Sequence, residues 1–117
     1  MTMLDAGWRL ERDERWGGNA MAYGIVLVFD SVTAEKYWAV NEKLGINSDG
    51  TGDWPDGMVT HSAGPTDSGW MVVEVWESKS DHERFLSGRL GRALGEVGVS
   101  EPVQVIASEL VNYQTPR

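Results

Sequence analysis

The sequence GMVTHSAGPTDSGWMVVEVWES, residues 57–78, predicts two β-strands joined by a short loop. Val and Met stand on both sides of a segment that contains Gly and Pro, with Thr before it and Trp after it, which is typical of a β-hairpin. Residues 64–69 form the expected six-residue loop, so that Ala63 pairs with Trp70. The other predicted elements are arranged around this hairpin.

His61 and Glu74 are the two residues of the hairpin best suited to chemistry. In the expected register, His61 lies opposite Val72 and Val59 lies opposite Glu74. His61 and Glu74 then become diagonal neighbours on one face of the sheet, whereas a slip by one residue would separate them. A neutral imidazole beside a carboxylate is a suitable proton acceptor, so both residues are candidate catalytic groups.

Upstream of the hairpin the sequence predicts a strand and a helix. Residues 23–30, YGIVLVFD, are apolar on both alternating faces, as expected for a central strand. Thr33 is a suitable N-cap for a helix over residues 34–44, and Gly45 is suited to end it.

Downstream of the hairpin a second helix and a last strand are expected. Ser80 and Glu83 form the capping box S-D-H-E, which places His82 at the second helical position and predicts that its side chain is exposed. Four glycines weaken this helix, so we expect it to be short or broken near Gly88. Residues 102–113 predict a strand that is more polar on one face, which favours a position near the sheet edge.

The order strand, helix, strand, strand, helix, strand predicts an α+β, ferredoxin-like βαββαβ fold with a four-stranded antiparallel sheet. In that arrangement the first and third strands are central, and these are the two most apolar strands here. One layer of helices covers only one face of such a sheet. We therefore expect a second subunit to cover the other face.

The chain divides into an N-terminal extension or arm, residues 1–20, and one domain, residues 21–117. Leu4, Trp8 and Trp16 would share one face of a short amphipathic helix, which Gly17 and Gly18 then end. Such an arm would pack on a partner subunit; a loosely attached extension is the equal alternative.

Composition excludes several classes of partner. The net charge of −8, without a basic patch, disfavours nucleic acid and anionic membrane surfaces. Cysteine is absent, which excludes disulfides and thiol nucleophiles. No signal sequence or membrane-spanning run is apparent, so a cytoplasmic location is expected.

The loop NSDGTGDWPDG, residues 47–57, has three aspartates and raises the question of calcium. An EF-hand register that starts at Asn47 places Gly52 correctly but puts Met58 where a bidentate Glu is required. We therefore expect a solvated turn and no metal site.

Four motifs carry a resemblance to a known superfamily over residues 21–114: M-A-Y-G-I, S-D-G…P-D-G, H-S-A-G-P and W-M-V-V-E-V-W-E-S. On these the chain resembles the dimeric α/β-barrel superfamily, in particular small bacterial proteins of the antibiotic-biosynthesis-monooxygenase type. The resemblance implies two sheets packed face to face in a homodimer, with a pocket between the sheet and the helices of each subunit.

The superfamily includes cofactor-independent monooxygenases, haem-degrading enzymes, isomerases and members without known activity. The haem-degrading pattern needs an Asn on the first strand, which YGIVLVFD lacks, and His82 is poorly placed as a haem ligand. No cofactor is therefore expected.

Aromatic residues are the candidate ligand-binding groups: Tyr23, Tyr37, Trp38, Trp70 and Trp76. Tryptophan rings would hold a flat apolar ligand, and tyrosine hydroxyls would hydrogen-bond to it. The alternative is that these rings fill the core or an interface, and that His61 and Glu74 form a structural contact.

Two functions follow from these observations. The first is a homodimer that binds an apolar or aromatic small molecule and catalyses cofactor-free oxygenation or proton-transfer isomerisation, with His61 as base. The second is a non-catalytic dimerisation or regulatory module of the same fold.

Overall fold

The computed structural model describes residues 22–116 of the chain. The extension expected over residues 1–20 lies outside the described residues. No helix within residues 22–116 is long and apolar enough to cross a lipid bilayer.

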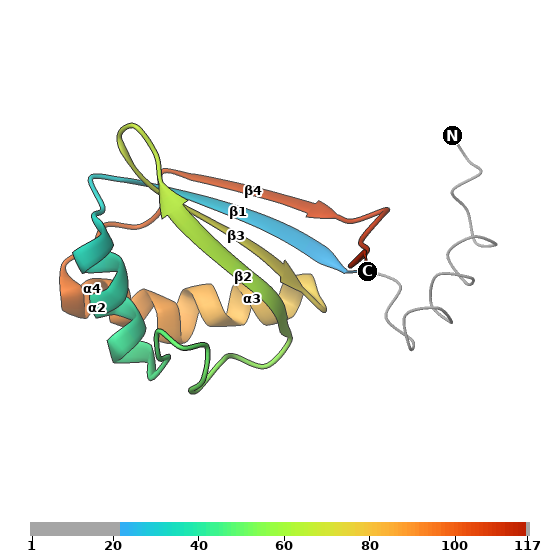
Figure 1. The fold of residues 1–117 in the computed structure, drawn as a ribbon, viewed down its shortest axis with the longest axis horizontal. Helices are drawn as coiled ribbons and strands as arrows, with labels where there is room; N and C mark the ends of the chain where they lie inside the picture. The colour runs from blue at the N-terminus through green and yellow to red at the C-terminus, as the bar shows by residue number, and fades with distance from the viewer. Residues whose placement is uncertain (1–21, 117) are drawn as a thin grey trace.

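The described chain forms one four-stranded antiparallel sheet with helices on one of its faces (Figure 1). The strand order is β2-β3-β1-β4, so the first and third strands are central, as predicted. This is the ferredoxin-like α+β fold. The strands are β1 (Tyr23–Asp30), β2 (Met58–Pro65), β3 (Gly69–Trp76) and β4 (Gln104–Glu109), and the helices are α2 (Ala34–Leu44), α3 (Lys79–Phe85), η2 (Leu86–Leu90) and α4 (Gly91–Val97).

Helix α2 begins and ends as the sequence predicts. The Thr33 side chain accepts a hydrogen bond from the Lys36 amide at 3.2 Å. Gly45 ends the helix in the left-handed region, with φ 79°, where a side chain would be strained. The Ile46 amide then donates to the Asn41 carbonyl at 3.0 Å, which completes the cap.

The second helical segment differs from the prediction at its start and in its middle. Ser78, not Ser80, is the N-cap, and its hydroxyl accepts from the Asp81 amide at 3.1 Å. The helix does not break near Gly88, because a π-helical segment, η2, connects α3 to α4 directly. The burial of Leu90 and Leu94 on the continuous helix outweighs the weak helix propensity of the glycines.

The hairpin register also differs from the prediction, by two residues. Pro65, not Ala63, pairs with Trp70, and the turn is only three residues long. The Thr66 amide donates to the Gly69 carbonyl at 3.0 Å and closes this turn. Proline is tolerated in β2 because β2 is an edge strand that needs no donor on its outer side.

The two-residue shift changes the contact between His61 and Glu74 but not their face. A shift of two preserves the alternation of side chains, so both residues still lie on the same side of the sheet. His61 now lies directly opposite Glu74 rather than diagonal to it. A β-bulge between Met58 and Thr60 additionally turns Met58 to the same face as His61.

The core lies between the sheet and the helices. Ile25, Leu27 and Trp76 are the most fully buried large side chains. On the opposite face of the sheet Val26, Val28, Val73 and Val75 are half-buried, and Met71 and Ile106 are exposed. β4 is the second edge strand, as predicted, although it is shorter than residues 102–113.

Candidate functional site

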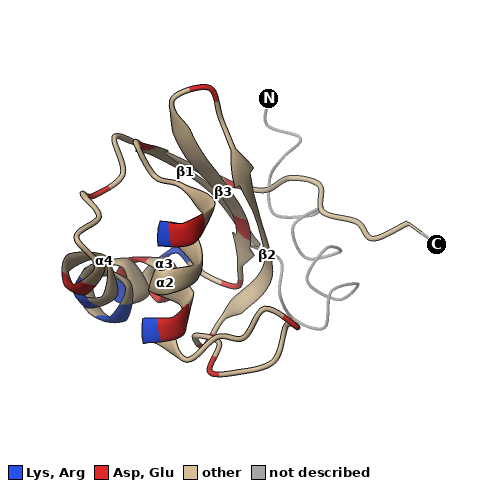
Figure 2. Cartoon of the chain, turned by 60° about the vertical axis from the view of Figure 1, so that its left-hand side comes forward, with Lys and Arg blue, Asp and Glu red and all other residues tan. Residues whose placement is uncertain are grey.

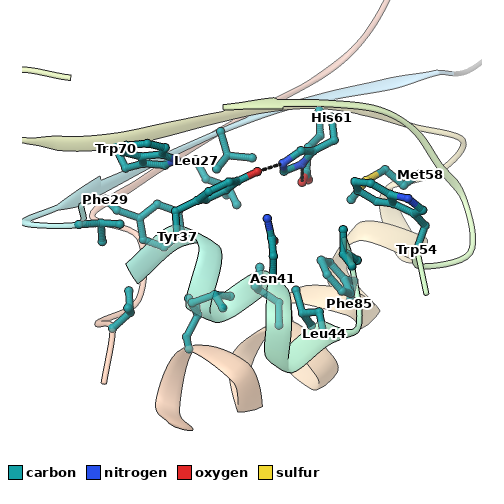
Figure 3. A pocket seen from close by; sticks show the side chains of 18 residues that line it. Leu27, Phe29, Tyr37, Asn41, Leu44, Trp54, Met58, His61, Trp70 and Phe85 are labelled. Carbon is teal, nitrogen blue, oxygen red and sulfur yellow. Dashed lines mark hydrogen bonds and ion pairs between the residues drawn. The ribbon is translucent and has the colours of Figure 1, made fainter. Parts of the chain in front are cut away.

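A mostly apolar cavity of about 50 Å³ lies between the sheet and helix α2 (Figure 3). Of the 18 residues that line it, four carry a hydrogen-bonding oxygen or imidazole: Tyr37, Asn41, His61 and Glu74. The volume is enough for a few water molecules, at about 10–15 Å³ each. It is smaller than the roughly 300 Å³ or more of a typical small-molecule site, so a ring-sized ligand needs a lining side chain to move.

His61 and Glu74 form the polar wall of this cavity. Strand pairing sets them directly opposite each other, and the His61 Nδ1 atom lies 2.8 Å from Glu74 Oε2. The Glu74 side chain is 4% exposed and that of His61 is 17% exposed. The sheet therefore brings the two predicted catalytic residues into contact, with the imidazole on the open side.

Trp76 fixes the other half of the carboxylate. Its indole Nε1–H donates to Glu74 Oε1 at 2.9 Å, and the Trp76 ring is fully buried. Because a carboxylate only accepts hydrogen bonds, Glu74 Oε2 requires a proton on His61 Nδ1. In the neutral form of this ring, Nε2 is the hydrogen-bond acceptor, and it faces Tyr37.

The Tyr37 hydroxyl is hydrogen-bonded to Nε2, the second ring nitrogen of His61. The phenol oxygen lies 2.5 Å from Nε2, so Glu74, His61 and Tyr37 form one hydrogen-bonded chain. Burial raises the pKa of Tyr37; the nearby Asn41 amide lowers it, and the negative charge of Glu74 raises it further. The Tyr37 hydroxyl is therefore protonated at neutral pH.

The predicted ligand-binding aromatics divide into two groups. Tyr37 and Trp70 line the cavity, with their ring centroids 5.2 Å apart. Trp76, Tyr23 and Trp38 do not line the cavity. Trp76 lies behind Glu74, and Tyr23 pairs with Trp76 at the end of β1. Trp38 is 48% exposed.

Asn41, Trp54, Met58 and Phe85 line the cavity and were not singled out from the sequence. Asn41 follows Tyr37 by one helical turn, and this spacing was the available signal. Trp54 lies on an irregular loop whose path no periodic pattern predicts, and Met58 turns inward only because of the bulge.

His82 is buried, at 3% exposure, which corrects the prediction that it is exposed. With Ser78 as the N-cap, His82 lies two helical positions later than expected and turns toward the sheet. Its ring packs edge-on against Trp76 at 5.4 Å, and its Nε2 atom has no hydrogen-bond partner among the described residues. Burial lowers the pKa of His82, and the charge of Glu74 opposes this effect.

Within residues 22–116, no three His, Asp or Glu side chains are grouped as metal ligands. Asp49 belongs to the loop that was considered for calcium. Its carboxylate accepts a hydrogen bond from the Thr51 hydroxyl of the same loop, at 2.7 Å.

Comparison of the whole chain with known proteins gives matches in structure only. No protein-family model matches the sequence, and no curated protein is similar to it at the sequence level. The "putative Antibiotic biosynthesis monooxygenase" from Chloroflexus aurantiacus J-10-fl superposes with a TM-score of 0.55 at 15% identity, over 80% of this chain and 97% of that protein. A protein of unknown function from Nitrosomonas europaea gives 0.52 at 17% identity, over 83% of this chain and 94% of its own. The chain shares the fold of these two proteins.

Proposed function

We propose that this chain forms a cytoplasmic homodimer whose subunits each bind an apolar or aromatic small molecule and transfer a proton to or from it without a cofactor. Isomerisation needs proton transfer alone. Oxygenation by molecular oxygen would follow proton removal from an electron-rich ring. The support for oxygenation is the name of the Chloroflexus protein, which describes it as a monooxygenase.

The observation that carries this proposal is the Glu74–His61 pair at the wall of an apolar cavity. A carboxylate on Nδ1 orients the imidazole and stabilises the imidazolium that forms when Nε2 receives a proton. The surrounding residues are mostly apolar, which lowers the local dielectric constant and strengthens this electrostatic effect.

Proton abstraction is tested without knowledge of the natural substrate. 2-Tetralone, a flat aromatic ketone with acidic C–H bonds, exchanges these hydrogens with D₂O, and NMR measures the rate. We expect the protein to accelerate the exchange, and His61→Ala to lower the protein-catalysed rate by about 10²–10⁴-fold, the usual contribution of a general base.

Ser62→Ala is the control for this experiment, because Ser62 neighbours His61 on the same strand but points to the opposite face. It should keep the wild-type rate. Equal exchange with wild type and His61→Ala would remove His61 from the mechanism.

Dimerisation is the second part of the proposal. The sheet face opposite the helices carries Val26, Val28, Val73 and Val75, and charged side chains lie mainly on helices and loops rather than on strands (Figure 2). An apolar sheet face of this kind is stabilised by a copy of itself, and a two-fold axis would pair the same strands from both subunits.

The cavity volume of about 50 Å³ favours the alternative function, a non-catalytic dimerisation or regulatory module. In that case the Glu74–His61–Tyr37 chain only satisfies buried polar groups. Three results together would support this alternative. The protein forms a dimer, it does not accelerate tetralone exchange, and neither wild type nor a variant with an enlarged cavity binds aromatic compounds.

A further inference from the structure

We propose that the Tyr37 hydroxyl oxygen, rather than His61 Nε2, is the atom that exchanges the proton with the ligand, and that Tyr37 passes its own proton to His61. This inference rests on the proposed proton-transfer function and adds Tyr37 to it as the catalytic residue that contacts the ligand.

The first argument is that Tyr37 blocks His61. The phenol oxygen lies 2.5 Å from His61 Nε2, and the Tyr37 and His61 rings are nearly parallel, at 12°, with centroids 6.1 Å apart. Nδ1 is occupied by Glu74. A ligand in the cavity therefore meets the Tyr37 oxygen before either nitrogen of His61.

The second argument is that Tyr37 is held in place by its neighbours. Its ring stacks on Trp70 at 5.2 Å and meets the edge of Trp38 at 5.0 Å. These contacts, together with the backbone of α2, hold the hydroxyl toward His61 (Figure 3). A relay needs such alignment, because proton transfer requires heavy atoms at hydrogen-bond distance.

Asn41 provides a second polar group at the same point of the cavity. It is one helical turn after Tyr37, is 7% exposed, and its amide nitrogen points into the cavity (Figure 3). An amide N–H in an apolar cavity stabilises negative charge that develops on a ligand oxygen. Tyr37 and Asn41 together therefore fit a ligand whose conjugate base is an oxyanion.

The proton transfer is balanced without an external reagent. The ligand C–H or O–H bond breaks and a new O–H bond forms on Tyr37, while the original Tyr37 O–H bond breaks and its proton bonds to His61 Nε2. The electron pair of the broken bond stays on the ligand as an enolate or phenolate. His61 becomes an imidazolium that is paired with the Glu74 carboxylate, and the reverse sequence returns the proton.

The protonated state of Tyr37 fits this scheme. Because burial raises the pKa of Tyr37, a free phenolate is not its resting state, and it accepts a proton only as it donates one to His61. The ligands that match are weak acids with a flat apolar body, namely phenols and enolisable aromatic ketones.

The test uses 4-nitrophenol as the probe, because its phenolate absorbs visible light and its neutral form does not. Spectra of the bound probe are recorded at a pH below the pKa of free 4-nitrophenol, for wild type, Tyr37→Phe, His61→Ala and Tyr23→Phe. Tyr23→Phe is the matched control, since Tyr23 lies on β1 outside the cavity. Circular dichroism checks that each variant is folded.

We expect wild type and Tyr23→Phe to bind the probe as phenolate, and Tyr37→Phe and His61→Ala to bind it only as the neutral phenol. Phenolate retained in Tyr37→Phe but lost in His61→Ala would overturn the role of Tyr37 and leave the proposed function standing. Neutral phenol bound to wild type would overturn the proton-transfer function itself. If wild type binds no probe, the comparison is repeated with Trp54→Ala in every variant, and absence of binding there overturns both.

Discussion

At the scale of single residues, Glu74 determines what the cavity is able to do. Both of its oxygens accept N–H donors, one from His61 and one from Trp76, so a buried carboxylate is fully satisfied and orients the imidazole. The sequence predicts that His61 and Glu74 share a face, because the alternation of side chains in two strands keeps them together as long as any error in the register is an even number of residues. It does not predict the Tyr37 hydrogen bond, because this depends on how α2 packs across the sheet.

His82 provides a prediction about stability and pH. Burial lowers the pKa of His82 in the folded protein, so the unfolded chain binds its proton more readily. The contribution of His82 to the free energy of unfolding is therefore fully present above the pKa of about 6.5 in the unfolded chain, and it is lost as the pH falls below that value. Replacement by Phe removes this titration.

As the pH falls from neutral to below 6, we expect the free energy of unfolding to decrease more for wild type than for His82→Phe. The extra decrease is at most about 1.4 kcal/mol per pH unit. Urea denaturation at a series of pH values measures it. Asp81→Asn, next to His82 and ion-paired with Arg84 on the surface, serves as a comparison with a carboxylate that titrates at lower pH. Parallel stability curves for wild type and His82→Phe would show that His82 is not buried in its neutral form.

At the scale of elements, the loop between α2 and β2 closes the cavity. Trp54 and Phe85 line both the cavity and an outer groove of about 380 Å³, so these two rings separate the two spaces. Phe85 is buried on a helix, whereas Trp54 is half-buried on the loop and its indole donates only to the Gly50 carbonyl of that loop, at 2.9 Å. We therefore expect Trp54 to be the side chain that moves if a ligand enters the cavity.

Trp54→Ala should increase the association rate of 4-nitrophenol, because the cavity then opens to the groove without a side-chain rotation. Stopped-flow absorbance measures this rate. Val103→Ala shortens an exposed apolar side chain that does not line the cavity and should leave the rate unchanged. Equal rates in wild type and Trp54→Ala would show that the ligand enters by another path.

The elements also show which parts of the fold the sequence determines locally. Thr33 and Gly45 define α2 through caps that involve only neighbouring residues, and both were predicted. The sequence alone does not distinguish Ser78 from Ser80 as the N-cap of the second helix, because serine is suitable at either position. The packing of His82 and Phe85 against Trp76 favours Ser78. The three-residue turn was missed because proline in a strand is disfavoured except at an edge.

At the scale of the whole molecule, the sheet has one covered face and one open face. The helices cover the cavity face of the sheet (Figure 1). The valines of β1 and β3 alternate with the buried core residues and so occupy the opposite face. Alternation within strands predicts both faces from the sequence. The partner that covers the open face is part of the proposed function.

Val73→Asp places a charge in the centre of the open face and should convert the proposed dimer to a folded monomer at micromolar concentration, because a buried unpaired carboxylate is strongly unfavourable at an interface. Sedimentation velocity gives the mass, and circular dichroism gives the fold. Ser100→Asp adds the same charge to an exposed loop and should remain dimeric. A monomeric wild type would contradict the dimer.

The central claim for the molecule is that loss of a proton by the ligand leaves His61 protonated, with Tyr37 as the relay and Glu74 holding the imidazole. ¹⁵N NMR of the His61 ring tests this most directly, in the protein with and without bound 4-nitrophenol. We predict a neutral ring protonated on Nδ1 in the free protein and an imidazolium, protonated on both nitrogens, in the complex. A His61 ring that stays neutral when the probe is bound would contradict the claim.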